Sequence, residues 1–331
     1  MQTLLLGPDA VERHADLPAV VDAVSAAFAA DARGNTIMPA KSYIDLPEYN
    51  GDFRSMPAYV HAGEWDAAAV KWVNVHPDNP TDHDLPTVLG TLIYSDPETA
   101  FPLAVMDGTN LTRLRTGGAA AVATDHLAVP DARSLGLVGA GTQAYTQLEA
   151  IATVRDIETV VIADRNERRQ RAFVEHFADR FDVRAGSIAD AAGCDVLSTI
   201  TPVESPIVDR EWVGEHTHVN AIGADAAGKH EHDDRTLQDA KLVIDDYEQC
   251  THSGEINVPW SDGLLDDDDI YGELGAVVAG DIPGRERDDG ITLFDSTGLA
   301  IQDVAAAHVA YTKARAAGDG TDFELVGTET T

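Results

Sequence analysis

The periodic pattern of hydrophobic and polar positions changes part-way along this chain of 331 residues. From Ser134 onward, short apolar runs alternate with segments in which apolar residues recur at helical spacing. The runs predict strands over 134–138, 159–163, 183–185, 195–200, 218–222, 242–245 and 290–295, and the first three are followed by predicted helices over 142 to about 154, 167–179 and 188–191. Strands that alternate with helices predict a parallel sheet covered on both faces, which is the doubly wound α/β architecture.

The first hundred residues follow a different pattern. Asp16-Leu-Pro opens a predicted helix over 17–32, and three alternating segments between residues 36 and 75 predict strands, as do 87–95 and 102–107. This sheet is expected to be antiparallel, with Pro39 and Pro57 at strand edges or turns.

Two further helices are predicted outside these two sheets. An alanine-rich helix over 111–127 leads into the second half, and a long helix over 299–317 has no evident place in the parallel sheet. We therefore expect the last helix to return to the first domain. The predicted domains are 1–115 with 299–331, and 116–298, and the polar tail after Gly318 is expected to be frayed.

A glycine-rich turn follows the strand over 134–138. Gly139, Gly141 and Ala144 form the pattern G-x-G-x-x-A, in which Thr142 and Gln143 begin the next helix. The first glycine allows a sharp turn, the second allows the backbone to approach a pyrophosphate, and the helix amino terminus faces the phosphates. Asp164 ends the next strand, at the separation typical of a carboxylate that binds the adenosine ribose. Strand, turn, helix, strand and acid in this order predict a dinucleotide-binding Rossmann domain.

The charge balance excludes some partners. Acidic residues outnumber basic ones 57 to 23, which gives a net charge of −34, and five of the basic residues are lysines. Such self-repulsion opposes binding to nucleic acid or to anionic membranes. Two explanations are open, a basic partner or adaptation to high salt, in which screening shortens the range of the repulsion. The acidic residues are spread along the whole chain, which favours adaptation to high salt over a basic partner.

The remaining composition indicates a soluble protein of a reducing cytoplasm. The two cysteines, Cys194 and Cys250, imply no framework of disulfides. The first ten residues lack the basic segment of a signal peptide, and no apolar run approaches the ~20 residues of a membrane span. Two polar clusters suggest metal ligands, the acidic run 266–269 and His230-Glu231-His232. We interpret the first as a solvated loop or helix start and the second as surface, and we predict no metal.

Longer stretches of the sequence resemble one protein family. They are AVKWVNVHPDNP, LPTVLGTLIYSDPETAFPLAVMDGTNLTRLRTGGAA, GLVGAGTQAY, HVNAIGADAAGK, DDYEQCTHSGEINV and ITLFDSTGLAIQDVA. From Leu4 to about Tyr311 the chain resembles the ornithine cyclodeaminase/mu-crystallin family, and within it the archaeal-type alanine dehydrogenase branch. The resemblance implies a Rossmann domain that binds NAD, and a discontinuous α+β domain that binds a small amino-acid or oxo-acid substrate and forms a homodimer. It also implies reversible, NAD-dependent oxidation of L-alanine to pyruvate and ammonia.

Such chemistry needs a cation for the carboxylate, a base for the nitrogen and a positioned water. By resemblance, Lys71 and Asp225 are the catalytic candidates, the lysine for proton transfer and the aspartate for water or the amine. The expected substrate ligands are Lys41, Arg54, Lys71 and Arg115. The expected cofactor contacts are Thr87, Arg115, Thr116, Gly139, Gly141, Thr142, Gln143, Asp164, Arg165, Thr199, Thr201, Gly223, Ala224, Asp225, Lys229, Ser296 and Thr297. The other interpretations are a surface lysine at position 71 and a cap at Asp225.

Two positions bear on specificity. Ornithine cyclodeaminases are expected to carry an acid at the position of Arg54, whereas an arginine would repel the distal amine of ornithine. Arg54 therefore favours alanine, unless its side chain points to solvent on the other face of its strand. Asp164 favours NAD because a carboxylate repels a 2′-phosphate, while Arg165 could accommodate one.

Three alternatives stay open. Ornithine cyclodeaminase and ketimine reductase would use the same hydride step, and a crystallin-like protein would bind a small molecule without catalysis. A binder would not need the acid/base positions, so the presence of Lys71, Asp225 and the glycine turn argues against it.

Overall fold

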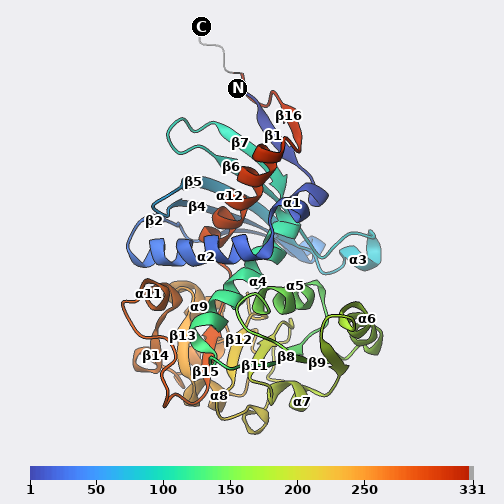
Figure 1. The fold of residues 1–331 in the computed structure, drawn as a ribbon, viewed down its shortest axis with the longest axis vertical. Helices are drawn as coiled ribbons and strands as arrows, with labels where there is room; N and C mark the ends of the chain where they lie inside the picture. Colours follow the sequence, from blue (N-terminus) through green and yellow to red (C-terminus); the bar gives the residue numbers. More distant parts are fainter. Residues whose placement is uncertain (328–331) are drawn as a thin grey trace. The chain divides into compact units, whose positions relative to one another are not determined.

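The structure is a computed structural model that describes residues 1–327 of the chain. The chain forms two compact units (Figure 1). One consists of Met1–Arg115 and the residues from Leu299 onward, and the other of Thr116–Gly298. Among residues 1–327, no helix combines the length and the apolar character that crossing a membrane requires.

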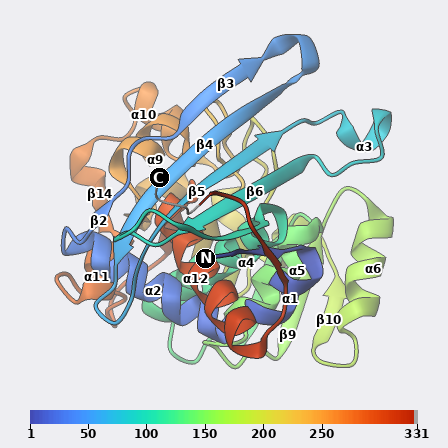
Figure 2. The ribbon, with the colours of Figure 1, turned by 90° about the horizontal axis from the view of Figure 1, so that it is seen from above.

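The first unit is built on a mixed sheet of eight strands, in the order β16-β1-β7-β6-β5-β4-β2, with β3 also paired to β4. The strands are β1 (Thr3–Leu6), β2 (Thr36–Ile37), β3 (Ser42–Leu46), β4 (Gly51–His61), β5 (Asp66–Val75), β6 (Val88–Ser95), β7 (Pro102–Asp107) and β16 (Thr321–Phe323). Figure 2 shows the long strands β4, β5 and β6 of this sheet side by side, with β3 folded back on β4.

Two expectations for this sheet are wrong. β1 pairs in parallel with β7, so the sheet is not purely antiparallel. β16 pairs with β1, so the tail after Gly318 is not frayed as far as Phe323, while residues 328–331 lie outside the described part of the chain. Both strands are short, and each forms because a partner distant in the chain supplies its hydrogen bonds.

Pro57 lies inside β4, opposite Val70 of β5, and not at a turn. On the other side of β4, β2 pairs with Tyr59 and Val60, and β3 pairs with the residues from Gly51 to Ser55. The gap between β2 and β3 therefore leaves Pro57 without a neighbouring strand on that side. A residue that cannot donate a backbone hydrogen bond is tolerated at such a local edge.

The helices of this unit include α1 (Pro8–His14), α2 (Leu17–Ala32), α3 (Asn79–Asp82), α12 (Ala300–Ala317) and a 3-10 turn at Pro47–Tyr49, and α4 (Gly108–Leu127) begins here. α2 begins as predicted, because the Asp16 side chain accepts from the Ala19 N–H and proline occupies the first turn. α12 packs against α2 and lies on β4, β5 and β6. The end of the chain therefore completes the core of the first unit.

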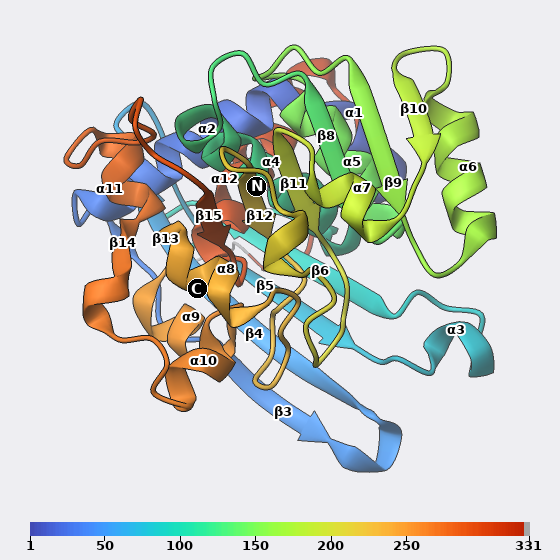
Figure 3. The ribbon, with the colours of Figure 1, turned by 90° about the horizontal axis from the view of Figure 1, so that it is seen from below.

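The second unit contains a sheet of eight strands whose pairs are all parallel, in the order β10-β9-β8-β11-β12-β15-β13-β14 (Figure 3). The strands are β8 (Ser134–Val138), β9 (Thr159–Ala163), β10 (Asp182–Ala185), β11 (Val196–Thr199), β12 (His218–Ala221), β13 (Lys241–Ile244), β14 (Ile270–Glu273) and β15 (Thr292–Asp295). The predicted doubly wound fold is confirmed. The strand order reverses direction between β8 and β11, which is where open α/β sheets bind ligands.

Helices cover both faces of this sheet. They are α5 (Thr142–Ile151), α6 (Glu167–Phe177), α7 (Ile188–Ala192), α8 (Asp234–Asp239), α9 (Tyr247–Ser253), α10 (Asn257–Ser261) and α11 (Leu274–Ala279), with 3-10 turns at Arg210–Trp212 and Asp267–Asp269. One apolar core contains Leu148 of α5 and Phe173 of α6, and the other contains Ala192 of α7 and Leu237 of α8. Apolar residues of the sheet strands contribute to both cores, for example Leu197 of β11 to one and Leu137 of β8 to the other.

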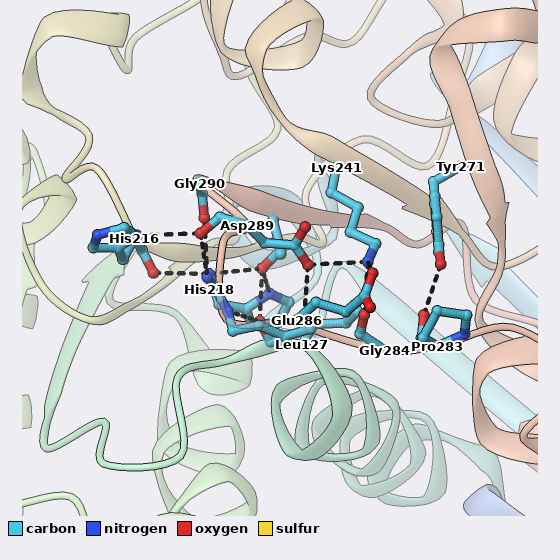
Figure 4. A network of polar contacts seen from close by, with 12 residues as sticks. Leu127, His216, His218, Lys241, Tyr271, Pro283, Gly284, Glu286, Asp289 and Gly290 are labelled. Atoms are coloured by element: carbon cyan, nitrogen blue, oxygen red, sulfur yellow. Dashed lines mark hydrogen bonds and ion pairs between the residues drawn. The ribbon is translucent and has the colours of Figure 1, made fainter.

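A polar network closes the amino-terminal edge of the same sheet (Figure 4). Arg285 donates to the backbone carbonyls of Leu127 at 2.7 Å, His216 at 2.8 Å and Gly290 at 3.0 Å. Lys241, at the start of β13, donates to the Gly284 carbonyl and to Asp289. The loop 281–290 is thereby tied to the last turn of α4 and to the segments that precede β12 and β15.

Candidate active site

Lys71 lies at the centre of a buried ionic cluster in the first unit. It occupies the middle of β5, opposite Met56 of β4 and Leu92 of β6, and it is 1% exposed. Its Nζ lies 2.8 Å from each carboxylate oxygen of Asp303, and it donates to the Thr112 hydroxyl at 3.2 Å. The alternative of a surface lysine on an edge strand is therefore wrong.

Arg115 completes this cluster from α4. Its Nε lies 3.2 Å from Asp303, and its Nη1 donates to the Gln302 side chain at 3.0 Å. Asp303 lies in the first turn of α12 and is 1% exposed. One carboxylate thus faces two cations, which leaves a net positive charge in a region of low dielectric.

Burial lowers the pKa of Lys71 to about 7, and Arg115 and Lys41 push its pKa in the same direction. Asp303 opposes them, because its negative charge and its hydrogen bond stabilise the ammonium. A lysine with a pKa near neutrality can both accept and donate a proton at physiological pH. Asp303 was not among the predicted residues, and its position in an alanine-rich helix gave no signal beyond that of a helix-terminal acid.

Arg54 shares a sheet face with Lys71. Its partner across the strands is Val73, two residues from Lys71, so Arg54 does not project from the opposite face as the alternative required. However, its guanidinium donates to both oxygens of Asp52, with Nη2 at 2.9 Å. The charge of Arg54 is thus partly neutralised by Asp52.

The two remaining candidates in this unit are Lys41 and Thr87. Lys41 lies between β2 and β3 and acts on Lys71 through its charge. Thr87 lies directly before β6, where its carbonyl accepts from the His76 N–H.

The glycine turn in the second unit has the geometry of a phosphate site. Gly139 has a φ of +104°, and a Cβ there would come within 2.9 Å of the Ile200 carbonyl oxygen. Gly141 is the N-cap residue of α5, and no side chain caps that helix. A Cβ at Gly141 would meet no atom within 4 Å, so the space in front of Thr142 and Gln143 is open. An open helix amino terminus at the switch point fits the pyrophosphate of a dinucleotide.

Asp164 supports the same turn. One carboxylate oxygen accepts from the Ala140 N–H and the other from the Asn166 N–H, both at 2.7 Å. Its side chain is half-buried, and the adjacent Arg165 is exposed.

The loops after β11 and β12 depend on a buried acid that the sequence interpretation missed. Glu231 accepts from the Thr201 N–H and hydroxyl, at 2.8 and 2.6 Å, and from the Gly223 N–H at 3.0 Å. Residues 230–232 are all buried, so their interpretation as surface is wrong. Thr199 is also fully buried, and its hydroxyl pairs with His232 at 2.9 Å. The sequence carried no signal for this role, because the donors to Glu231 come from loops 30 and 8 positions earlier in the chain.

Three further candidate groups lie in this unit. Asp225 is paired with Lys229, four residues further on, and Ala224 beside it is buried. Ser296 and Thr297 follow β15 and donate to the Asp245 carboxylate. Thr116 is buried, and its carbonyl accepts from Gln147.

The polar clusters hold no evident metal site. Within residues 1–327, no group of three or more His, Cys, Asp or Glu side chains is arranged to hold a metal ion. In the acidic run, Asp266 caps the 3-10 turn Asp267–Asp269 by accepting from the Asp268 N–H. The interpretation of this run as a helix start is confirmed.

Comparison with known proteins gives one consistent assignment. A model of the ornithine cyclodeaminase/mu-crystallin family matches residues 1–318. The alanine dehydrogenase of Archaeoglobus fulgidus is 47% identical over 315 residues, which cover 95% of this chain and 96% of that protein. A solved archaeal alanine dehydrogenase dimer with bound NAD superposes with a TM-score of 0.94 at 45% identity, and covers 98% of this chain and 100% of that one.

A second solved structure marks the breadth of this relationship. The Δ1-pyrroline-2-carboxylate reductase of Thermococcus litoralis, in complex with NADH and L-proline, superposes with a TM-score of 0.92 at 36% identity. The match covers 96% of this chain and 99% of the reductase. Likeness of this extent, in sequence as well as in fold, means that the chain belongs to the ornithine cyclodeaminase/mu-crystallin family.

Proposed function

We propose that this protein is an NAD-dependent alanine dehydrogenase that converts L-alanine to pyruvate and ammonia, reversibly. The observation that carries the proposal is the buried cluster of Lys71, Asp303 and Arg115, in a chain 47% identical to an alanine dehydrogenase. The cluster supplies what a small amino acid requires, a surplus cation for its carboxylate and a group that exchanges protons near neutral pH.

Each residue group has a distinct part in this reaction. Arg115, with Arg54 and Lys41, binds the substrate carboxylate by charge and by the planar geometry of guanidinium. Lys71 takes the proton from the substrate nitrogen in oxidation and returns it in reduction, and Asp303 keeps its Nζ in place. Asp225, with Lys229, orients the water that converts the imine to the oxo acid. Bound NAD would supply the acceptor for the hydride of the α-carbon.

The second unit supports binding of NAD. Gly139, Gly141 and the open amino terminus of α5 would hold the pyrophosphate, and the half-buried Asp164 would accept from the adenosine ribose. A carboxylate at this position repels a 2′-phosphate, which favours NAD over NADP although Arg165 is adjacent.

We also propose a homodimer that works in a salt-rich cytoplasm. One face of the first unit's sheet exposes Ile44, Trp72 and Ile93, whose side chains are 52%, 42% and 40% exposed. Apolar area of this kind on a sheet face is typical of a subunit interface. Both cysteines are free and buried, which agrees with a reducing compartment. The net charge of −34 supports adaptation to high salt.

The test is NADH formation, followed by its ultraviolet absorbance, with L-alanine, L-ornithine, L-lysine and L-proline supplied separately in molar KCl. We expect net NADH with L-alanine. Ornithine consumed with release of ammonia and without net NADH would indicate a cyclodeaminase. NADH from proline, with none from alanine, would indicate a pyrroline-2-carboxylate reductase and would overturn the proposal.

A further inference from the structure

Glu231 joins two loops at the carboxyl-terminal edge of the parallel sheet. One oxygen of its carboxylate accepts from the N–H and hydroxyl of Thr201, in the loop after β11. The other oxygen accepts from the N–H of Gly223, in the loop after β12. The residue is completely buried, so both oxygens are satisfied by the protein and not by water.

The same loops are closely packed against one another. A Cβ added at Gly223 would overlap both the Thr201 carbonyl oxygen and the Glu231 carboxylate. A Cβ added at Gly139 would come within 3.2 Å of the Thr201 Cγ2 atom and 2.9 Å of the Ile200 carbonyl oxygen. Thr201 therefore contacts the glycine turn on one side and Glu231 on the other. The segments that follow β8, β11 and β12 form one packed unit through these two residues.

The backbone of Glu231 is itself held by fixed groups. Its carbonyl accepts from the N–H groups of Ile207 and Val208, at 2.8 and 3.0 Å. Its N–H donates to the carboxylate of Glu255, which is buried as well. Because its backbone is fixed in this way, the Glu231 carboxylate can hold the two loops that donate to it in place.

We propose that Glu231 is a positioning residue for the dinucleotide: it holds Thr201 and Gly223 in the places that shape the binding site beside Gly139. The inference rests on the dinucleotide site of the proposed function. It assigns to Glu231 no contact with the ligand, since its oxygens already accept from the two loops. The three loops lie where the strand order reverses, at the edge where sheets of this class bind nucleotides.

The experiment compares NAD binding by the intact protein and by Glu231→Gln, followed through tryptophan fluorescence in molar KCl. The amide has one acceptor oxygen, so either Thr201 or Gly223 loses its partner. We expect the dissociation constant for NAD to rise about tenfold, as for loss of a buried hydrogen bond to a charged group. The kcat at saturating NAD and alanine should change by no more than about twofold. Glu215→Gln is the matched control, because Glu215 is exposed and precedes β12 at the opposite edge of the sheet.

Thr201→Val gives an independent variant if Glu231→Gln folds poorly. It keeps the methyl group beside Gly139 and removes one donor to Glu231, so the NAD dissociation constant should rise by a smaller factor. In the double variant, the NAD dissociation constant should rise by less than the product of the two single factors, because both changes break the same interaction. A dissociation constant no higher than that of Glu215→Gln would overturn the inference, as would a fall in kcat alone.

The outcomes separate this inference from the proposed function. If the intact protein binds NAD but does not oxidise alanine, the proposed function fails, and the binding data still decide the role of Glu231. If the intact protein does not bind NAD, both fail.

Discussion

At the scale of single residues, the ionisation of Lys71 is a balance between burial and one carboxylate. Transfer of an ammonium out of water is costly, and it lowers the pKa of Lys71 to about 7. The Asp303 carboxylate, 2.8 Å from Nζ, prevents a larger fall. Because Asp303 also contacts Arg115, it affects the net charge of the ionic cluster as well as the proton affinity of the lysine.

Asp303→Asn should therefore alter the pH profile of alanine oxidation. Neutral Lys71 is the form that accepts a proton, so kcat/KM of the intact protein should rise with pH through a midpoint near the Lys71 pKa of about 7. Loss of the negative charge destabilises the ammonium, so the pKa of Lys71 falls and the midpoint moves to lower pH by roughly one unit. The measurement is kcat/KM for alanine against pH at constant salt.

The matched control for this change is Asp22→Asn. It removes the same charge from an exposed position on α2 in the same unit, and it should leave the midpoint in place. A midpoint that stays unchanged in Asp303→Asn, or moves to higher pH, would contradict the role given to Asp303.

At the scale of elements, the sequence predicted those that carry local signals and missed those that depend on partners distant in the chain. α2, β7, β8 and β9 begin and end where predicted, because caps, prolines and apolar runs bounded by turns are local signals. β1 and β16 were missed, since each is stabilised by a partner at the other end of the chain.

The candidate site follows the same division. Lys71 was predicted because it lies in a stretch that resembles the family. Asp303 was not, because its contact with Lys71 spans 232 positions. Glu231 was taken for surface, since a polar triplet carries no sign of the buried donors that satisfy it.

Arg285→Ala tests the network at the amino-terminal edge of the parallel sheet. The guanidinium donates to four backbone carbonyls, from Leu127, His216, Asp289 and Gly290, and the bonds to Leu127 and Asp289 are partly buried. We expect the free energy of unfolding to fall by about 1–3 kcal/mol. Urea unfolding measures it, with Arg287→Ala as the control because Arg287 is exposed on the same loop. Equal losses in the two variants would show that the network adds no stability.

At the scale of the whole molecule, the apolar sheet face of the first unit bears on assembly. Trp72 and Ile93 lie on the face opposite Lys71, because strand residues alternate between faces. Phe53 stacks on Trp72 at 5.2 Å, which makes the patch continuous across β4 and β5.

Ile93→Lys should convert the proposed dimer to a monomer, because it introduces a charge into an apolar interface. Light scattering after size-exclusion chromatography in molar KCl gives the mass directly. Leu264→Lys is the control, since Leu264 is similarly exposed, at 47%, but belongs to the second unit. A dimer that persists in Ile93→Lys, or that dissociates equally in Leu264→Lys, would place the interface elsewhere.

The discontinuity of the first unit has a consequence for folding during synthesis on the ribosome. The second unit is encoded without interruption and can fold as soon as Gly298 has emerged, as domains generally do during synthesis. The first unit must wait, because α12 and β16 are translated last. Until then Lys71 lacks the aspartate that holds its ammonium in place, so the nascent chain can form the parallel sheet of the second unit before the ionic cluster of Lys71, Asp303 and Arg115 assembles.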